Sequence, residues 1–139
     1  MRLWHKDLIS YLPRQQLLGQ WRECCAIAKS IREKGTTNHM LVNRVMRYPL
    51  EHFIHYCCVV YGECVVRGYR VNWDRIDDYF YDPIDPLAEA GRYVDTFPYW
   101  HNDRYLMQCY YNLQEKYDCG GISRENWQMI DSFVASQVG

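Results

Sequence analysis

The clearest candidates for chemistry lie on one predicted helix, where Arg22 is followed directly by Glu23. A carboxylate can take up and return protons during a reaction, and a neighbouring guanidinium can hold a phosphate or another anion. Apolar residues recur at helical spacing along the same segment and leave this pair outside the buried stripe. By itself, however, an adjacent Arg and Glu more often form a solvent-exposed ion pair. The pair therefore marks a candidate site without identifying a reaction.

A second group of side chains has the types that bind metal ions. His52, His55 and Cys58 share one predicted helix at spacings that place them near one face. The spacing indicates no fourth ligand, and a helical His beside Tyr and Cys is more often a partly buried imidazole. No phosphate-binding loop, dinucleotide fingerprint, HExxH or GxSxG motif occurs. We therefore expect no metal and no organic cofactor, and we expect His39 and His101 to be polar partners.

The cysteines predict a reducing, cytoplasmic environment. There are 7 of them, no CxxC occurs, and the adjacent pairs Cys24-Cys25 and Cys57-Cys58 suit neither a disulfide framework nor a zinc site. The first pair lies inside a predicted helix, away from the N-terminus where the helix dipole would lower a thiol pKa, so we expect it in the core. The opening MRLWHKDLIS has no apolar export region, and no run approaches the roughly 18 apolar residues of a membrane span.

The elements that position these residues are predicted to be helices. Periodic apolar residues, with Pro13, Gly35, Gly68 and Ser123 near the ends of segments, give helices at 13–35, 38–47, 49–67, 102–117 and 123–138. Residues 71–100 hold three of the five prolines and no sustained period, which predicts a long ordered connection. The 139 residues therefore predict one all-α domain, 1–139, with three to five helices and no strand.

Charge and aromatic residues are unevenly distributed. The net charge of -1 excludes a histone-like polyanion binder, yet residues 1–70 carry 11 basic and 5 acidic residues, whereas 71–139 carry 5 and 12. This split indicates either a basic binding face backed by an acidic one or two halves that attract each other within the fold. The aromatic share is 16%, more than a core of this size needs, so some rings should lie at a surface.

Three separated segments resemble one enzyme family. DLISYLPRQQLLGQWRE is similar to the start of the phage-type pyrimidine-dimer DNA glycosylases with apurinic-site lyase activity, the endonuclease V of ultraviolet repair. ECVVRGYRV resembles the end of that family's second long helix, and NLQEK followed by RENW resembles its C-terminal motifs. The resemblance implies a compact all-α fold with the N-terminal segment packed between helices. It also implies double-stranded damaged DNA as the partner.

The resemblance also implies a mechanism and a set of site residues. In the family, the free α-amine attacks the sugar C1′ of the damaged nucleotide, and a carboxylate on the first helix assists the proton transfers. Carried over, these roles fall on the amine of Met1 and on the Glu23 side chain. Arg22 and Gln15 match contacts to DNA, Arg2 matches the arginine beside the nucleophilic terminus, and Lys116 matches a basic contact to phosphate. Gln16, where the family has His, is counted with the DNA contacts.

The sequence departs from the family pattern at several of these positions. The family removes its initiator Met and uses a small Thr, whereas the large Arg2 predicts that Met1 is retained. One additional residue precedes DLIS, so the backbone there must run differently. Ala26 and Asn112 stand where the family has basic residues. These changes remove positive charge from the expected DNA face.

Two other functions are compatible with the same residues. A non-catalytic nucleic-acid or protein binding module would keep the helical scaffold without a competent terminus. An enzyme acting on another nucleotide-like substrate would use Glu23 in the same pocket. The leading prediction is a monomeric DNA repair glycosylase with lyase activity on ultraviolet photoproducts.

Overall fold

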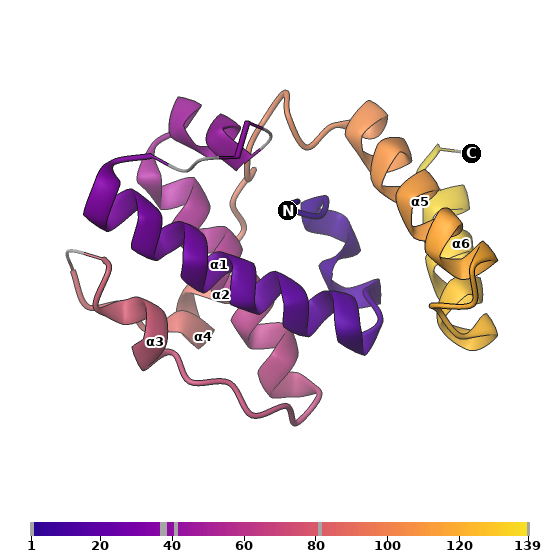
Figure 1. Ribbon diagram of the computed structural model, residues 1–139, viewed down its shortest axis with the longest axis horizontal. Coiled ribbons are helices and arrows are strands. Elements are labelled where there is room, and N and C mark those ends of the chain that lie inside the picture. The colour runs from indigo at the N-terminus through magenta and orange to yellow at the C-terminus, as the bar shows by residue number, and fades with distance from the viewer. Residues whose placement is uncertain (1, 37–38, 41, 81, 139) are drawn as a thin grey trace.

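The described residues form helices, joined by loops, around one core. The computed structural model describes residues 2–36, 39–40, 42–80 and 82–138. Within these residues there are six α-helices, two 3-10 helices and no strand, which confirms the all-α class but exceeds the predicted count of three to five helices. Figure 1 shows α1 lying across α2, with α5 and α6 forming a separate pair and the N-terminal segment between the two groups.

Helices α1 and α2 form the centre of the fold. α1 spans Arg14–Lys34; Pro13 is its N-cap residue, and it ends at Gly35, whose φ of 75° is the left-handed conformation that glycine tolerates best. α2 spans Leu50–Val66 and is followed by Gly68 in the same conformation. Both helices bury most of the stripes expected from the sequence, including Leu17, Trp21, Cys25, Ala28, Phe53, Cys57 and Cys64. Val65, which was predicted with them near the end of α2, is exposed.

The pair α5 and α6 closes the other side of the N-terminal segment. α5 spans Asp103–Asp118, and the Asn102 side chain caps it by accepting a hydrogen bond from the Tyr105 amide at 3.0 Å. α6 spans Arg124–Val138, and the predicted cap Ser123 accepts from the Asn126 amide at 3.1 Å. The turn between the two helices contains Gly120 at φ 82°.

The connection over 71–100 contains more helix than the sequence predicts. It contains two short helices, α3 over Asp74–Asp77 and α4 over Pro86–Ala90, and α4 packs against α2. Neither is long enough to show a helical period, which is why the sequence pattern missed them. The predicted helix at 38–47 includes two residues outside the described chain; beyond them a 3-10 helix, η2, spans Val42–Arg47.

The cysteines and aromatic rings are mainly core. Six of the 7 cysteines are buried, and none forms a disulfide in this structure. Burial, with a smaller effect of Cys24, raises the pKa of Cys25 to about 11, so this thiol is neutral at physiological pH. Among the exposed rings are Tyr93 and Tyr99, at 93% and 92% exposure.

None of the helices in the described part is long and apolar enough to cross a membrane.

Candidate active site beside the N-terminal segment

Residues 2–6 enter the fold as an extended segment held by side chains from three helices and a loop. Each of the following hydrogen bonds joins the backbone of this segment to a distant side chain. The Trp4 amide donates to Gln20 Oε1 at 2.8 Å, and the Tyr56 hydroxyl lies 2.6 Å from the Trp4 carbonyl oxygen. The Tyr105 hydroxyl donates to the Leu3 carbonyl oxygen, and the Lys6 amide donates to His101 Nδ1 at 2.9 Å. These bonds fix the position of the chain relative to α1, α2 and α5.

The segment then turns into η1, a 3-10 helix over Lys6–Tyr11. The His5 side chain caps it by accepting from the Asp7 amide at 3.1 Å, and this imidazole is 3% exposed. Burial lowers the pKa of His5, which keeps Nδ1 free to accept that bond. Leu8 and Ile9 are fully buried, so the short helix anchors the segment in the core.

The first bond of the segment reaches the candidate carboxylate. The Arg2 amide donates to Glu23 Oε2 at 3.1 Å, across 21 residues of sequence. Glu23 is half-buried on α1. Gln20, three residues earlier on the same helix, likewise accepts a hydrogen bond from a backbone amide of the segment, that of Trp4. Two side chains one helical turn apart thus align the beginning of the chain along α1.

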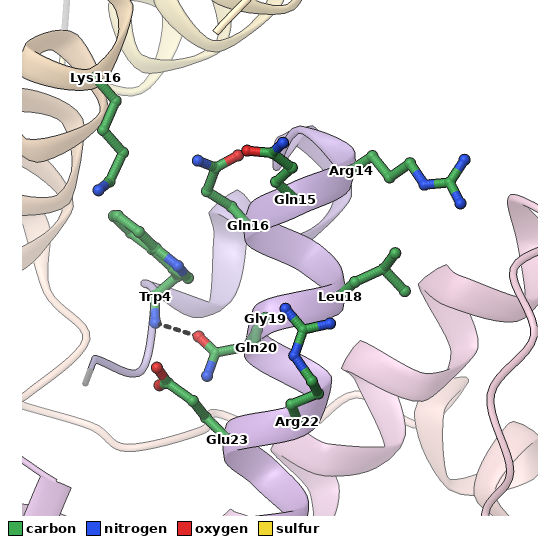
Figure 2. A pocket seen from close by; sticks show the side chains of 10 residues that line it. All are labelled: Trp4, Arg14, Gln15, Gln16, Leu18, Gly19, Gln20, Arg22, Glu23 and Lys116. Atoms are coloured by element: carbon green, nitrogen blue, oxygen red, sulfur yellow. Dashed lines mark hydrogen bonds between the residues drawn. The ribbon is translucent and has the colours of Figure 1, made fainter. Parts of the chain in front are cut away.

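A pocket of about 530 Å³ opens around Glu23. Figure 2 shows Gln16, Gln20 and Glu23 extending from α1 toward Trp4, with Lys116 reaching in from α5, whereas Arg14 and Leu18 point the other way. Five of the predicted site residues line this pocket: Gln15, Gln16, Arg22, Glu23 and Lys116. We refer to it as the Glu23 pocket. The residues that line it are mostly polar, and they include one carboxylate and the cationic Arg22 and Lys116.

The remaining predicted site residues are placed differently. Met1 lies outside the described residues. The Arg2 backbone is at Glu23, but its guanidinium lies 5.7 Å from the centre of the Trp4 ring and lines a second cavity together with Arg44 and Trp100. Arg2 therefore contacts Glu23 through its backbone, while its side chain reaches α5, where Nη1 lies 4.0 Å from Cys109 Sγ.

Gln20 is the most deeply buried polar residue of the pocket and was not among the residues predicted from the sequence. It is 1% exposed, and its Oε1 accepts from the Trp4 amide, which can only donate, so the other end of the side-chain amide carries the nitrogen. The Tyr56 hydroxyl lies 3.1 Å from the same Oε1. Its Nε2 is buried and has no partner in the described chain. A buried donor left unpaired is rare, so this amide group is a candidate donor to a bound molecule. A Gln inside an apolar stripe was the only sequence signal.

The candidate metal ligands have other partners. His52 Nδ1 accepts from the Phe97 amide at 3.1 Å, and His55 Nδ1 lies 3.3 Å from Glu89 Oε1. Across the residues with described positions, no three His, Cys, Asp or Glu side chains are grouped as a metal site would require. His101 accepts from Lys6, in the polar-partner role predicted for it.

Comparison with known proteins gives one match. The family model described as pyrimidine dimer DNA glycosylase matches residues 1–77, which include α1, α2 and the whole N-terminal segment. No curated protein and no solved structure matches the chain significantly. The match covers more than half of the chain and includes Glu23, Gln20 and Tyr56. Lys116 and Tyr105, on α5, lie beyond it.

Proposed function

Because the chain belongs to the pyrimidine dimer DNA glycosylase family, we propose that it excises damaged pyrimidines and then cleaves the strand as an abasic-site lyase, with the Met1 amine as nucleophile and Glu23 as proton carrier. Family membership supports the glycosylase activity on DNA. The lyase step, the nucleophile and the residue roles are our proposal. No metal or organic cofactor takes part in the proposed steps.

The bond between the Arg2 amide and Glu23 is the observation that carries this proposal. Met1 is joined directly to Arg2, and three covalent bonds of about 1.3 to 1.5 Å separate the α-nitrogen of Met1 from the Arg2 nitrogen. An amine tethered in this way is confined to the neighbourhood of the carboxylate. Positioning of this kind is what a nucleophile and its proton acceptor need.

The chemistry uses the ordinary acidity of an α-amine. Its pKa of about 7.7 to 8.0 leaves a useful neutral fraction at physiological pH, unlike that of lysine. The neutral nitrogen attacks C1′, the bond from C1′ to the base breaks, and the base departs with the electron pair. Glu23 takes the proton lost by the amine and delivers it to the sugar ring oxygen as the ring opens to an imine. Glu23, which is again a carboxylate, then takes a proton from C2′; the electron pair of that C–H bond forms the C2′–C3′ double bond, and the bond from C3′ to its oxygen breaks and releases the 3′ phosphate.

The rest of the Glu23 pocket supports binding of a DNA strand. Arg22 on α1 and Lys116 on α5 supply positive charge from opposite sides, and Gln15 and Gln16 supply neutral donors and acceptors. The unpaired Nε2 of Gln20 supplies a donor next to Glu23, suited to a sugar or base oxygen. The exposed aromatic rings are available to stack on unpaired bases.

Borohydride trapping tests the proposal directly. The untagged protein is incubated with an oligonucleotide duplex carrying a cyclobutane dimer, and separately with one carrying an abasic site, and the imine is reduced to a stable adduct. We expect an adduct with the wild-type protein and its loss in Glu23→Gln, whose amide oxygen can still accept from Arg2. Glu33→Gln, an exposed residue of the same helix, is the matched control and should retain the adduct.

Two outcomes would contradict the proposal. Failure to trap either substrate would exclude the imine mechanism, and DNA binding without trapping would favour the non-catalytic binding module. Equal trapping by Glu23→Gln and wild type would remove Glu23 from the mechanism.

A further inference from the structure

A second, more enclosed cavity of about 280 Å³ lies beside the Glu23 pocket. Two arginine side chains line it without any carboxylate, together with two aromatic rings, one aliphatic side chain and one amide: Arg2, Arg44, Trp100, Tyr105, Leu3 and Gln108. We call it the Arg44 cavity. It combines elements that are distant in sequence, since these residues come from the N-terminal segment, η2, the loop before α5, and α5 itself.

The two cationic groups of this cavity are held in place but are not neutralised. The Arg44 guanidinium lies 5.1 Å from the centre of the Trp100 ring, a cation–π contact with an indole that is only 3% exposed. The Arg2 guanidinium lies 5.7 Å from the centre of the Trp4 ring, and its Nη1 donates to Cys109 Sγ at 4.0 Å. Neither guanidinium forms an ion pair with any carboxylate of the described residues. Two fixed, unneutralised guanidinium groups in an enclosed space favour an anion.

The loop that supplies Trp100 is strained. Phe97 and Tyr99, on either side of Pro98, both have positive φ, at 54° and 68°, a conformation that costs a bulky residue about 1 to 3 kcal/mol. Phe97 is fully buried against Trp100, with ring centres 4.9 Å apart, and this packing holds the indole in the cavity wall. Strain of this kind persists only where the surrounding structure over-determines it, and it concentrates at functional sites.

We propose that the Arg44 cavity binds a phosphate group of a nucleic-acid strand, as an anion subsite separate from the Glu23 pocket. This proposal rests on the proposed function, which brings a DNA strand to Glu23. Arg2 connects the two places, because its amide contacts Glu23 while its guanidinium lines the cavity. In the proposed complex, a strand bound at the Glu23 carboxylate places a neighbouring phosphate in the cavity. The amide of Gln108, exposed on α5, adds a neutral donor at the wall.

The salt dependence of DNA binding tests the proposal with a matched pair of variants. Arg44→Gln and Arg47→Gln remove the same charge from the same short helix, but only Arg44 lines the cavity. Binding is measured on a duplex with a stable abasic analogue at several salt concentrations. We expect Arg44→Gln to weaken binding about tenfold and to reduce the slope of log affinity against log salt by about 0.9, the value for one phosphate contact. Arg47→Gln should change affinity less than about twofold and leave the slope unchanged.

A second pair of variants tests the cavity without removing the contact of Arg44 with Trp100. Gln108→Glu puts a carboxylate on the wall, whereas Gln128→Glu adds the same charge to the exposed face of α6. We expect only the first to weaken DNA binding, by about tenfold or more, because a carboxylate near the subsite repels phosphate. Thermal unfolding of each variant identifies any loss that is due to misfolding.

Free mononucleotide and inorganic phosphate distinguish the source of the phosphate. We expect neither to stabilise the protein against thermal unfolding at micromolar concentration. A different result would assign the cavity to a free nucleotide: a mononucleotide stabilises the wild-type protein, Arg44→Gln abolishes this stabilisation, and Arg44→Gln leaves the salt dependence of duplex binding unchanged. This result would overturn the assignment to DNA. Equal effects of Arg44→Gln and Arg47→Gln on DNA binding would overturn the subsite. Failure of the wild-type protein to bind DNA at all would instead overturn the proposed function together with this inference.

Discussion

The two sides of the N-terminal segment differ in the chemistry they present. The side toward α1 has an open pocket of about 530 Å³ with the Glu23 carboxylate and the unpaired amide of Gln20. The side toward η2 and α5 has an enclosed cavity of about 280 Å³ with two guanidinium groups and no acid. The first has groups that can move protons, whereas the second can only attract an anion.

The difference indicates how the fold separates reaction from binding. The same short segment forms a wall of both spaces, through Trp4 in the pocket and through Arg2 and Leu3 in the cavity. Its own backbone bonds go to Glu23 and Gln20 on one side and to Tyr105 on the other. A carboxylate inside the cavity would neutralise its arginines, and additional guanidinium groups at Glu23 would favour its charged form over proton transfer. Keeping the two chemistries on opposite sides avoids both effects.

The largest expected effect comes from displacing the α-amine, which should affect the Glu23 side alone. Adding Gly-Ser before Met1 moves the terminal nitrogen by up to about 7 Å along the chain. We expect the borohydride-trapped adduct to fall at least about 100-fold, because the nucleophile is no longer beside the carboxylate. Affinity for a duplex with a stable abasic analogue, measured in the same preparation, should change less than about threefold. Undiminished trapping by the extended protein would exclude the α-amine as the nucleophile.

The next effect concerns the segment that divides the two sides. Tyr56→Phe removes the hydroxyl that lies 2.6 Å from the Trp4 carbonyl oxygen and 3.1 Å from Gln20 Oε1, both buried. We expect the free energy of unfolding to fall by about 1 to 3 kcal/mol, the cost of a buried polar group left unpaired. Tyr110→Phe, whose hydroxyl bonds to the exposed Asp131, should lower it by less than about 1 kcal/mol. Urea unfolding of both variants measures the difference, and equal losses would show that the buried bonds do not hold the segment.

The sequence predicts one side of this comparison much better than the other. Glu23, Arg22, Gln15 and Gln16 come from a single helix, so helical spacing together with the family resemblance places them on one pocket. Lys116 joins them from α5, where the resemblance had marked it. In the Arg44 cavity, residues 2, 44, 100 and 105 meet only through tertiary packing. No local period connects them, and the loop conformation at Phe97 and Tyr99 has no glycine to indicate it.

The presence or absence of a local sequence period also explains which parts of the fold were predicted. The four long helices have apolar stripes and end signals such as Gly35 and Ser123, and their ends agree with the prediction within about one residue. α3 and α4 are 4 and 5 residues long, too short for a period, and they form because their neighbours pack on them. The aromatic residues of 71–100 order this connection, as the contact between Trp73 and Trp21 shows.

A smaller effect is the pH dependence of the free energy of unfolding, which we expect from His101 on the side toward α5. Burial, with smaller contributions from nearby cationic groups, lowers the pKa of His101 to about 2, so the folded protein keeps this imidazole neutral and accepting from the Lys6 amide. In the unfolded chain the same group takes up a proton below about pH 6.5. The unfolded state therefore binds more protons, and the free energy of unfolding should fall as pH drops from 6.5 to 5, by up to about 1.4 kcal/mol per unit.

His101→Asn separates this contribution from others. The amide oxygen can accept from Lys6 in place of Nδ1, but it has no titration in this range. Between pH 5 and 6.5, we expect the variant to lose part of the slope of the free energy of unfolding against pH. The part due to His5 should remain, because burial lowers the pKa of His5 as well. Denaturant unfolding at several pH values measures the slope, and an unchanged slope would show that His101 is not the group responsible.

The smallest expected effect concerns whether a strand in the Glu23 pocket contacts α5 as well as α1. Lys116 lies across the pocket from Arg22 but is exposed, and exposed charges contribute little individually. Lys116→Gln should weaken binding to the abasic-analogue duplex about two- to fivefold at 0.1 M salt and reduce the salt slope by about 0.9. Arg124→Gln, an exposed residue at the start of α6, removes the same charge outside the pocket and should leave the slope unchanged. If the two variants have the same slope, DNA contacts only the α1 wall, and the part of the chain beyond the family match contributes to binding through the Arg44 cavity alone.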